Sequence, residues 1–225
     1  MRSRLDHPNF VYLLSGLLAV LCLNPILRDL FDYSSSFLSS LIFSSTLILG
    51  IWSLHESKRL FRFGIVLICA SLAISLAVSF RPELAILRVF DIIILFTFCS
   101  VSFMFILAEI TTDLNVDANR VVGAVCLYLL VGIMFGLFYM LIEAFLPGSF
   151  TNLYTNENID DFSDKLFYYS FVTLTTLGYG DITPVRPIAK TVAFIEAIVG
   201  VFYMAILVGT LIGLFLNRAR DTTAD

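Results

Sequence analysis

A short run late in the chain, Thr175-Thr176-Leu177-Gly178-Tyr179-Gly180, has residue types suited to binding a dehydrated cation. Gly178 and Gly180 can adopt backbone angles that other residues avoid, so successive carbonyls can all point toward one axis. Thr176 adds a hydroxyl oxygen. Rings of carbonyls from several chains can replace the hydration shell of an ion without adding net charge. The run therefore predicts a ladder of cation ligands, of which one chain supplies a share.

A tight extracellular turn is the competing interpretation, because an isolated Gly-x-Gly often marks one. The residues before the run argue against it. An apolar patch from Leu166 to Leu177 is too short to span a bilayer, and it lies within a longer stretch from Pro147 to Pro187. Non-helical backbone at membrane depth is tolerated only where protein buries it or water lines it. We therefore expect a re-entrant loop that builds a pore or a cavity.

Composition places this loop in a bilayer. The 225 residues are 59% hydrophobic and 14% charged, with a mean hydropathy of +0.93, which is too apolar for a soluble domain of this length. The net charge is −4 and the basic residues are scattered, so no nucleic-acid surface is predicted. Membrane lipid is the expected partner. The four cysteines lie in apolar runs and are interpreted as small buried hydrophobes.

Six apolar runs are long enough to cross a membrane as helices, so the predicted fold class is an all-α integral membrane protein. They are approximately 9–27, 36–54, 63–80, 84–109, 119–146 and 188–216. Asn24-Pro25 and then Arg28-Asp29 are expected to end the first run, which is interpreted as a retained helix and not as a signal peptide. Six crossings place both termini on one side, and the moderate lysine and arginine bias favours the cytoplasm.

The segment from Tyr168 to Pro184, YYSFVTLTTLGYGDITP, resembles the pore of potassium channels. The resemblance covers the chain from Arg120 onward and implies a six-transmembrane-helix, voltage-gated-like architecture with a degenerate sensor. It implies a homotetramer in the plasma membrane (the inner membrane if the cell is bacterial) that conducts K⁺ passively. Leu177 departs from the family, in which valine or isoleucine is commoner at this position.

The resemblance also implies roles for individual residues. The carbonyls of Thr176, Leu177, Gly178 and Tyr179, with the Thr176 hydroxyl, would bind K⁺ in a filter completed by Gly180. Thr175 would face an inner cavity, below a pore helix at about 164–175. Support for the filter is expected from an aromatic cuff of Tyr168, Tyr169 and Tyr179, with Tyr169 paired to Asp181. Acids of the outer mouth (Glu157, Asp160, Asp161, Asp164 and Asp181) would attract cations, although a solvated loop explains Glu157 and Asp160 equally well.

Gating residues are expected on the last helix. Gly200 lies where the family has a hinge, but close helix packing explains a membrane glycine equally well. Met204, Val208 and Ile212 recur at helical spacing, so they could close the pore by dewetting or simply pack. Only Arg81 and Arg88 lie just before or within the fourth run, whereas a voltage sensor needs about 3 to 4 gating charges per subunit. Voltage dependence is therefore expected to be weak or absent.

The predicted domains are a four-helix domain at 1–115, a pore domain at 116–218 and a cytoplasmic tail at 219–225. No nucleophile with a base, phosphate loop or metal cluster is recognised, so neither an enzyme nor a covalent cofactor is expected. Three rivals stay open or are disfavoured. A non-selective cation channel would usually lack the tyrosine or the second glycine of the Gly178-Tyr179-Gly180 motif. A secondary transporter would need inverted repeats and midplane charges, and neither is recognised. A non-conducting accessory or sensor subunit stays open as an alternative.

Overall fold

The computed structural model describes residues 10–31, 58–80, 85–111, 118–153 and 161–221, and this part of the chain is mostly helical. The helices are α1 (Phe10–Phe31), α3 (Lys58–Phe80), α4 (Ala85–Thr111), α5 (Ala118–Phe145), α6 (Asp161–Leu174) and α7 (Pro187–Asp221). Within the described residues the extended pairing is limited to one isolated bridge, between Phe150 and Pro184. The all-α class is confirmed for this part of the chain.

Three of the described helices are long and apolar enough to cross a membrane. The qualifying stretches are Ile86–Ile110 in α4, Asn119–Phe145 in α5 and Pro187–Leu207 in α7. Shorter apolar stretches are Phe10–Leu23 in α1 and Gly64–Val78 in α3. The predicted crossing at 36–54 lies outside the described residues. Five of the six expected runs therefore coincide with a helix, and three of these meet the length of a span.

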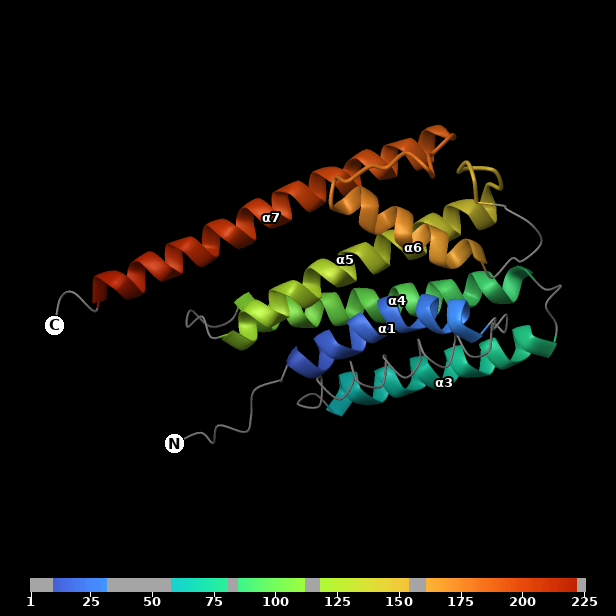
Figure 1. Cartoon of the computed structure of the whole chain (residues 1–225). Helices are drawn as coiled ribbons and strands as arrows, with labels where there is room; N and C mark the ends of the chain where they lie inside the picture. Colours follow the sequence, from blue (N-terminus) through green and yellow to red (C-terminus); the bar gives the residue numbers. More distant parts are fainter. Residues whose placement is uncertain (1–9, 32–57, 81–84, 112–117, 154–160, 222–225) are drawn as a thin grey trace.

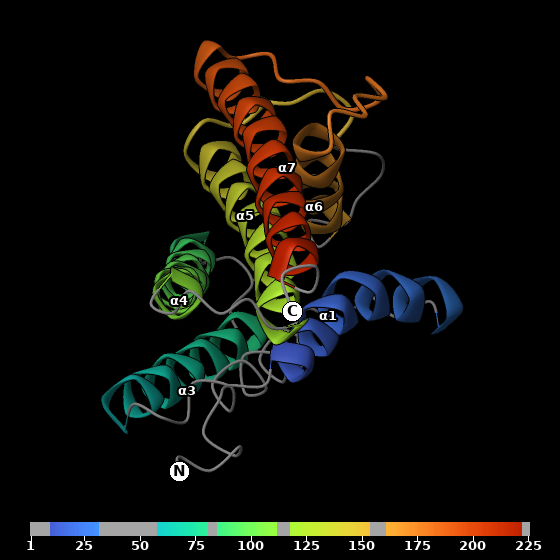
Figure 2. The same ribbon diagram turned by 90° about the vertical axis from the view of Figure 1, so that its left-hand side faces the viewer.

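Helix α5 is the central element. It contacts α1, α4, α6 and α7, while α3 packs on α4. Figure 1 shows α6 lying between α5 and one end of α7, and α1 beginning at the same end of the molecule at which α7 ends. Viewed along the bundle, α7 covers α5 on one side while α1, α3 and α4 lie on the other (Figure 2). In this single chain, α5 therefore lies between the group formed by α1, α3 and α4 and the pair formed by α6 and α7.

Two glycines let α6 approach α5 closely. Gly132 and Gly136 lie one turn apart on α5, and a Cβ atom built on them would meet the ring of Phe171 at 2.6 Å and that of Phe167 at 2.5 Å. Such distances are inside normal van der Waals contact. Small residues four apart on a membrane helix allow this kind of approach. The Gly132-x-x-x-Gly136 pair therefore positions the short helix.

Helix α1 continues to Phe31, past Asn24-Pro25 and Arg28-Asp29, which were expected to end the first run. Proline inside a helix removes one backbone hydrogen bond and bends the axis but need not end the helix. Figure 2 shows α1 changing direction along its length. The N-terminal end of α1 is held on α5, where the Phe10 amide donates to Asn119 Oδ1 at 3.0 Å. The cysteine expectation is half right, since Cys99 and Cys126 are buried but Cys22 and Cys69 are exposed.

Candidate functional site

The candidate site begins with α6, which enters the protein without crossing it. Its 14 residues give a length of about 21 Å, whereas a bilayer core is about 30 Å thick. Leu166, Ser170 and Leu174 recur every four residues and are all buried, so one stripe of the helix faces α5 and α7. The helix begins three residues before the predicted position and ends one residue before it.

After α6 the backbone takes an alternating conformation. Thr176 has a φ of 58°, Gly178 of 59° and Gly180 of 78°, while no positive φ occurs at the residues between them. In an ordinary strand successive carbonyls point to opposite sides, and alternating left-handed residues can bring them to one side. The φ of Thr176 is uncommon for a residue with a side chain, and such strain gathers at functional sites.

Hydrogen bonds to the end of α6 hold the start of this loop. The amide of Leu177 donates to the Val172 carbonyl at 2.9 Å, and the amide of Gly178 donates to the same oxygen at 3.3 Å. Thr176 donates its amide to Thr173 O at 2.9 Å. The loop geometry therefore depends directly on where α6 lies.

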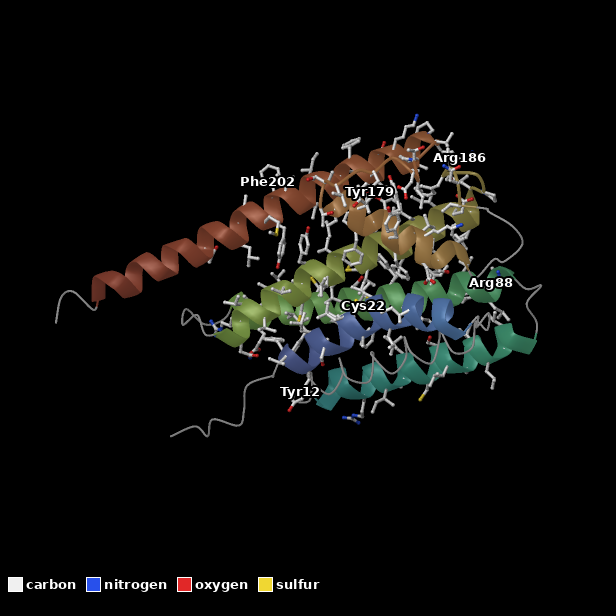
Figure 3. All side chains as sticks on the ribbon, viewed as in Figure 1. Tyr12, Cys22, Arg88, Tyr179, Arg186 and Phe202 are labelled. Atoms are coloured by element: carbon white, nitrogen blue, oxygen red, sulfur yellow. The ribbon has the colours of Figure 1, made fainter. Side chains whose placement is uncertain are left out.

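The loop is largely uncovered in the single chain. Residues 175–181 are exposed, with Leu177 at 56% and Tyr179 at 67%. Figure 3 shows Tyr179 on the loop beside α6 and α7, and Phe202 projecting from α7 on the side away from α5. Within a membrane, a non-helical loop needs a cover of protein or water.

The aromatic pair at the start of the motif corrects one expectation. Tyr169, which we expected to bond to Asp181, is only 6% exposed and packs edge-to-face on Tyr139 and Phe150, with ring centroids 5.1 and 5.3 Å away. The preceding residue, Tyr168, makes the hydrogen bond to Asp181. Because adjacent helical residues point about 100° apart, only one of the two can face the loop after the candidate filter.

The outer end of the candidate filter is tied back to α5. Thr151 N donates to Thr183 O at 2.9 Å, Val185 N donates to Ser149 O at 2.8 Å, and Asn152 Nδ2 donates to Asp181 O at 2.7 Å. The segment 147–153 is itself held by Glu143 of α5, whose two carboxylate oxygens accept the amides of Gly148 and Ser149 at 2.7 and 2.9 Å. The segment 147–153, which follows α5, is therefore hydrogen-bonded to the segment 181–185, which follows the candidate filter.

A buried acid behind the loop was missed by the sequence analysis. Glu196 of α7 is fully buried. It lies within the apolar Pro187–Leu207 stretch, where the sequence analysis named no ionisable residue. Tyr139 Oη donates to Glu196 Oε2 at 2.5 Å, and Ser170 Oγ lies 2.5 Å from Glu196 Oε1. The available signal was one acid in a long apolar run, which in membranes marks function by default.

Helix α7 carries the expected gate residues. A Cβ atom on Gly200 would overlap the backbone carbonyl of Leu174, the last residue of α6, which supports the close-packing interpretation of this glycine. Helix α7 runs unbroken through Gly200. Met204 is exposed. The side chains of Val208 and Ile212 lie outside those that the structure describes.

Several other expected residues are only partly placed. Glu157 and Asp160 of the acidic mouth lie outside the described residues, as does the side chain of Asp161. Arg81 also lies outside the described residues. Arg88 of α4 lies at the same end of the molecule as Arg186 (Figure 3). Asp91 accepts a hydrogen bond from Ser71 Oγ of α3 at 2.8 Å. Acid enrichment at the mouth therefore stays a prediction.

Comparison with known proteins agrees with this geometry. Residues 124–217 match the family model described as "Ion channel". The chain is 33% identical over 84 residues to the inward rectifier potassium channel Kirbac3.1 of Paramagnetospirillum magnetotacticum, which is 36% of this chain and 24% of that protein. It is 35% identical over 60 residues to a voltage-gated potassium channel of Aeropyrum pernix, 27% of this chain and 20% of that protein.

A third relative is the two pore potassium channel c of Oryza sativa subsp. japonica, 34% identical over 90 residues, which is 40% of this chain and 18% of the relative. The matches therefore span a quarter or less of each relative. No solved structure matches the chain significantly. The apolar helices, the short re-entrant helix and these matches define a multi-pass membrane protein with an ion-channel domain. Residues 124–217 therefore resemble an ion-channel domain, and parts of the chain are similar to three potassium channels.

Proposed function

We propose that the chain is one subunit of a homotetrameric, K⁺-selective channel whose filter is Thr176-Leu177-Gly178-Tyr179-Gly180. The observation that carries the proposal is the alternating positive φ at Thr176, Gly178 and Gly180, immediately after a short buried helix. This backbone suits a row of carbonyls along one axis. Relatives described as potassium channels favour K⁺ as the permeant ion, and a channel that conducts passively is not an enzyme.

The assembly follows from what a single chain lacks. Four loops are needed to surround one ion, and the loop residues 175–181 are exposed here. The half of α7 that leads to its C-terminal end stands apart from the other helices (Figure 1). Along α7, from its first half into its second, exposed side chains include Phe194, Ile198, Val201, Phe202 and Ile206. A closed ring of identical subunits would cover these residues with their copies and with membrane lipid.

We assign 1–115 to a domain in the voltage-sensor position, 116–218 to the pore domain and 219–225 to a tail. Six crossings would place both termini in the cytoplasm, and the beginning of α1 and the end of α7 lie at the same end of the molecule. Since α4 contains Arg88 as its one basic residue, voltage dependence is weak or absent in this proposal. Thr175, Tyr168 and Asp181 support the filter, and Met204, Val208 and Ile212 line the gate.

Potassium flux from liposomes tests the assignment. Gly178→Ala should abolish the preference for K⁺ over Na⁺, because alanine disfavours a φ of 59°. Gly148→Ala is the matched control: Gly148 has a φ of 75°, and neither glycine has an atom within 4 Å of an added Cβ in this chain. This control should keep the preference. Equal Na⁺ and K⁺ flux in the wild type would favour a non-selective channel, and no flux at any voltage would favour an accessory subunit.

A further inference from the structure

Glu196 joins three helices behind the candidate filter. It comes from α7, Tyr139 from α5 and Ser170 from α6, and all three side chains are buried. Ser170 lies four residues before the end of α6, and the filter amides of Leu177 and Gly178 bond to Val172 of the same helix. Any shift of α6 at Ser170 is therefore passed to the candidate filter.

This cluster has more close oxygen pairs than hydroxyl hydrogens to join them. Ser170 Oγ lies 2.5 Å from Glu196 Oε1 and 2.7 Å from the carbonyl oxygen of Gly132. A serine hydroxyl has one hydrogen, and a backbone carbonyl can only accept. If the hydroxyl donates to Gly132, the hydrogen between Ser170 and Glu196 has to come from the carboxyl group. With an ionised Glu196, one of these two close oxygen pairs would have no hydrogen.

We propose that Glu196 is a proton-binding site: its protonated carboxyl donates through Oε1 to Ser170 and accepts from Tyr139 through Oε2, and so positions α6 beneath the filter. Each close oxygen pair then has one hydrogen. Tyr139 donates to Glu196, Glu196 donates to Ser170, and Ser170 donates to Gly132. The role in positioning the filter rests on the proposed channel function, whereas the protonation itself does not.

The surroundings of Glu196 favour an uncharged carboxyl. In the described part of the chain, its hydrogen-bond partners are Tyr139 and Ser170. The titratable groups that face it are Tyr139 and Tyr128 of α5 and Tyr169 of α6, and tyrosine is neutral near pH 7. None of them supplies a positive charge. A buried ion without a counter-charge is strongly disfavoured, especially within a membrane.

Glu143 provides the opposite case within the same chain. Its two oxygens both face backbone amides, those of Gly148 and Ser149. Amides can only donate, so both Glu143 oxygens act as acceptors there. Glutamine resembles a protonated glutamate in having one donor and one acceptor end. Glutamine should therefore replace Glu196 without loss, but at Glu143 it should set its own amide against an amide.

The first experiment measures the proton directly. Infrared spectra of the full chain in liposomes are recorded in H₂O and in D₂O at neutral pH. Their difference should contain the carbonyl band of a protonated carboxylic acid, because this band shifts in D₂O. Glu196→Gln should remove this band, and Glu143→Gln should leave it. A wild-type spectrum without the band, or a band that survives Glu196→Gln, would overturn the proposal. This measurement does not require the chain to conduct.

The second experiment tests the positioning role through the ratio of K⁺ to Na⁺ flux. Glu196→Gln should keep the wild-type ratio. Glu196→Leu should lower it about tenfold or more, because it leaves the buried hydroxyls of Tyr139 and Ser170 without their partner. Ser170→Ala, a smaller change, should also lower it and serves if Glu196→Leu fails to fold. A normal ratio in Ser170→Ala, or equal losses in Glu196→Gln and Glu196→Leu, would contradict the role. A wild type without K⁺ preference would instead refute the channel assignment.

Discussion

Replacing Gly200 by alanine should damage the protein even though alanine favours helices. The new Cβ would overlap the backbone carbonyl of Leu174, at the point where α6 ends. A flexible side chain could turn aside, but this oxygen belongs to the backbone that leads into the candidate filter. Either α7 or the end of α6 must therefore move.

The expected size follows from two opposing terms. Overpacking a close contact costs about 1–3 kcal/mol, and occasionally more. Exchanging glycine for alanine inside a helix contributes about 1 kcal/mol in the other direction. Contact with a backbone atom places this site at the upper end of the overpacking range, so we expect a net destabilisation of about 1–2 kcal/mol. For a chain of this size, that corresponds to a fall in Tm of roughly 2–8 °C.

Gly209→Ala is the matched control on the same helix, because an added Cβ there meets no atom within 4 Å. Thermal unfolding of the two variants in detergent, followed by circular dichroism, gives the comparison. Gly200→Ala should melt below the wild type, and Gly209→Ala at or above it. Equal Tm values for the two variants would refute the packing argument. A Gly200→Ala protein with unchanged Tm but altered opening would favour the hinge interpretation instead.

Two further substitutions test contacts of α6. Gly132→Ala should lower the Tm because its Cβ meets the Phe171 ring at 2.6 Å. Adding Phe171→Leu should restore part of the lost Tm. A double variant whose Tm is no higher than that of Gly132→Ala would contradict this. Tyr168→Phe removes the hydrogen bond to Asp181 and should reduce K⁺ preference in liposome flux, while Tyr169→Phe should not. Partial desolvation and this hydrogen bond raise the pKa of Tyr168 above its ordinary value, so the phenol keeps its proton and the bond persists from pH 6 to about 9. A difference between Tyr168→Phe and wild type that vanishes over this pH range would count against the bond.

The local sequence was sufficient for the helices and for the position of the candidate filter. Apolar length predicts membrane helices because lipid leaves the backbone no other hydrogen-bond partner, and α3, α4, α5 and α7 lie where the hydropathy placed them. The glycines of the Gly178-Tyr179-Gly180 motif have the positive φ that their residue type permits. Both features depend on neighbours within one segment, so sequence alone determines them.

Contacts between segments were decided by tertiary structure. Glu196 meets Ser170 across 26 positions of the chain and Tyr139 across 57, and the sequence does not state which helix faces meet. The choice of Tyr168 over Tyr169 as the partner of Asp181 likewise depends on how α6 is rotated against α5, because Gly132 and Gly136 admit the Phe171 and Phe167 rings. Helix rotation is set by side-chain packing between segments, and hydropathy alone cannot define it where a helix is apolar on all sides.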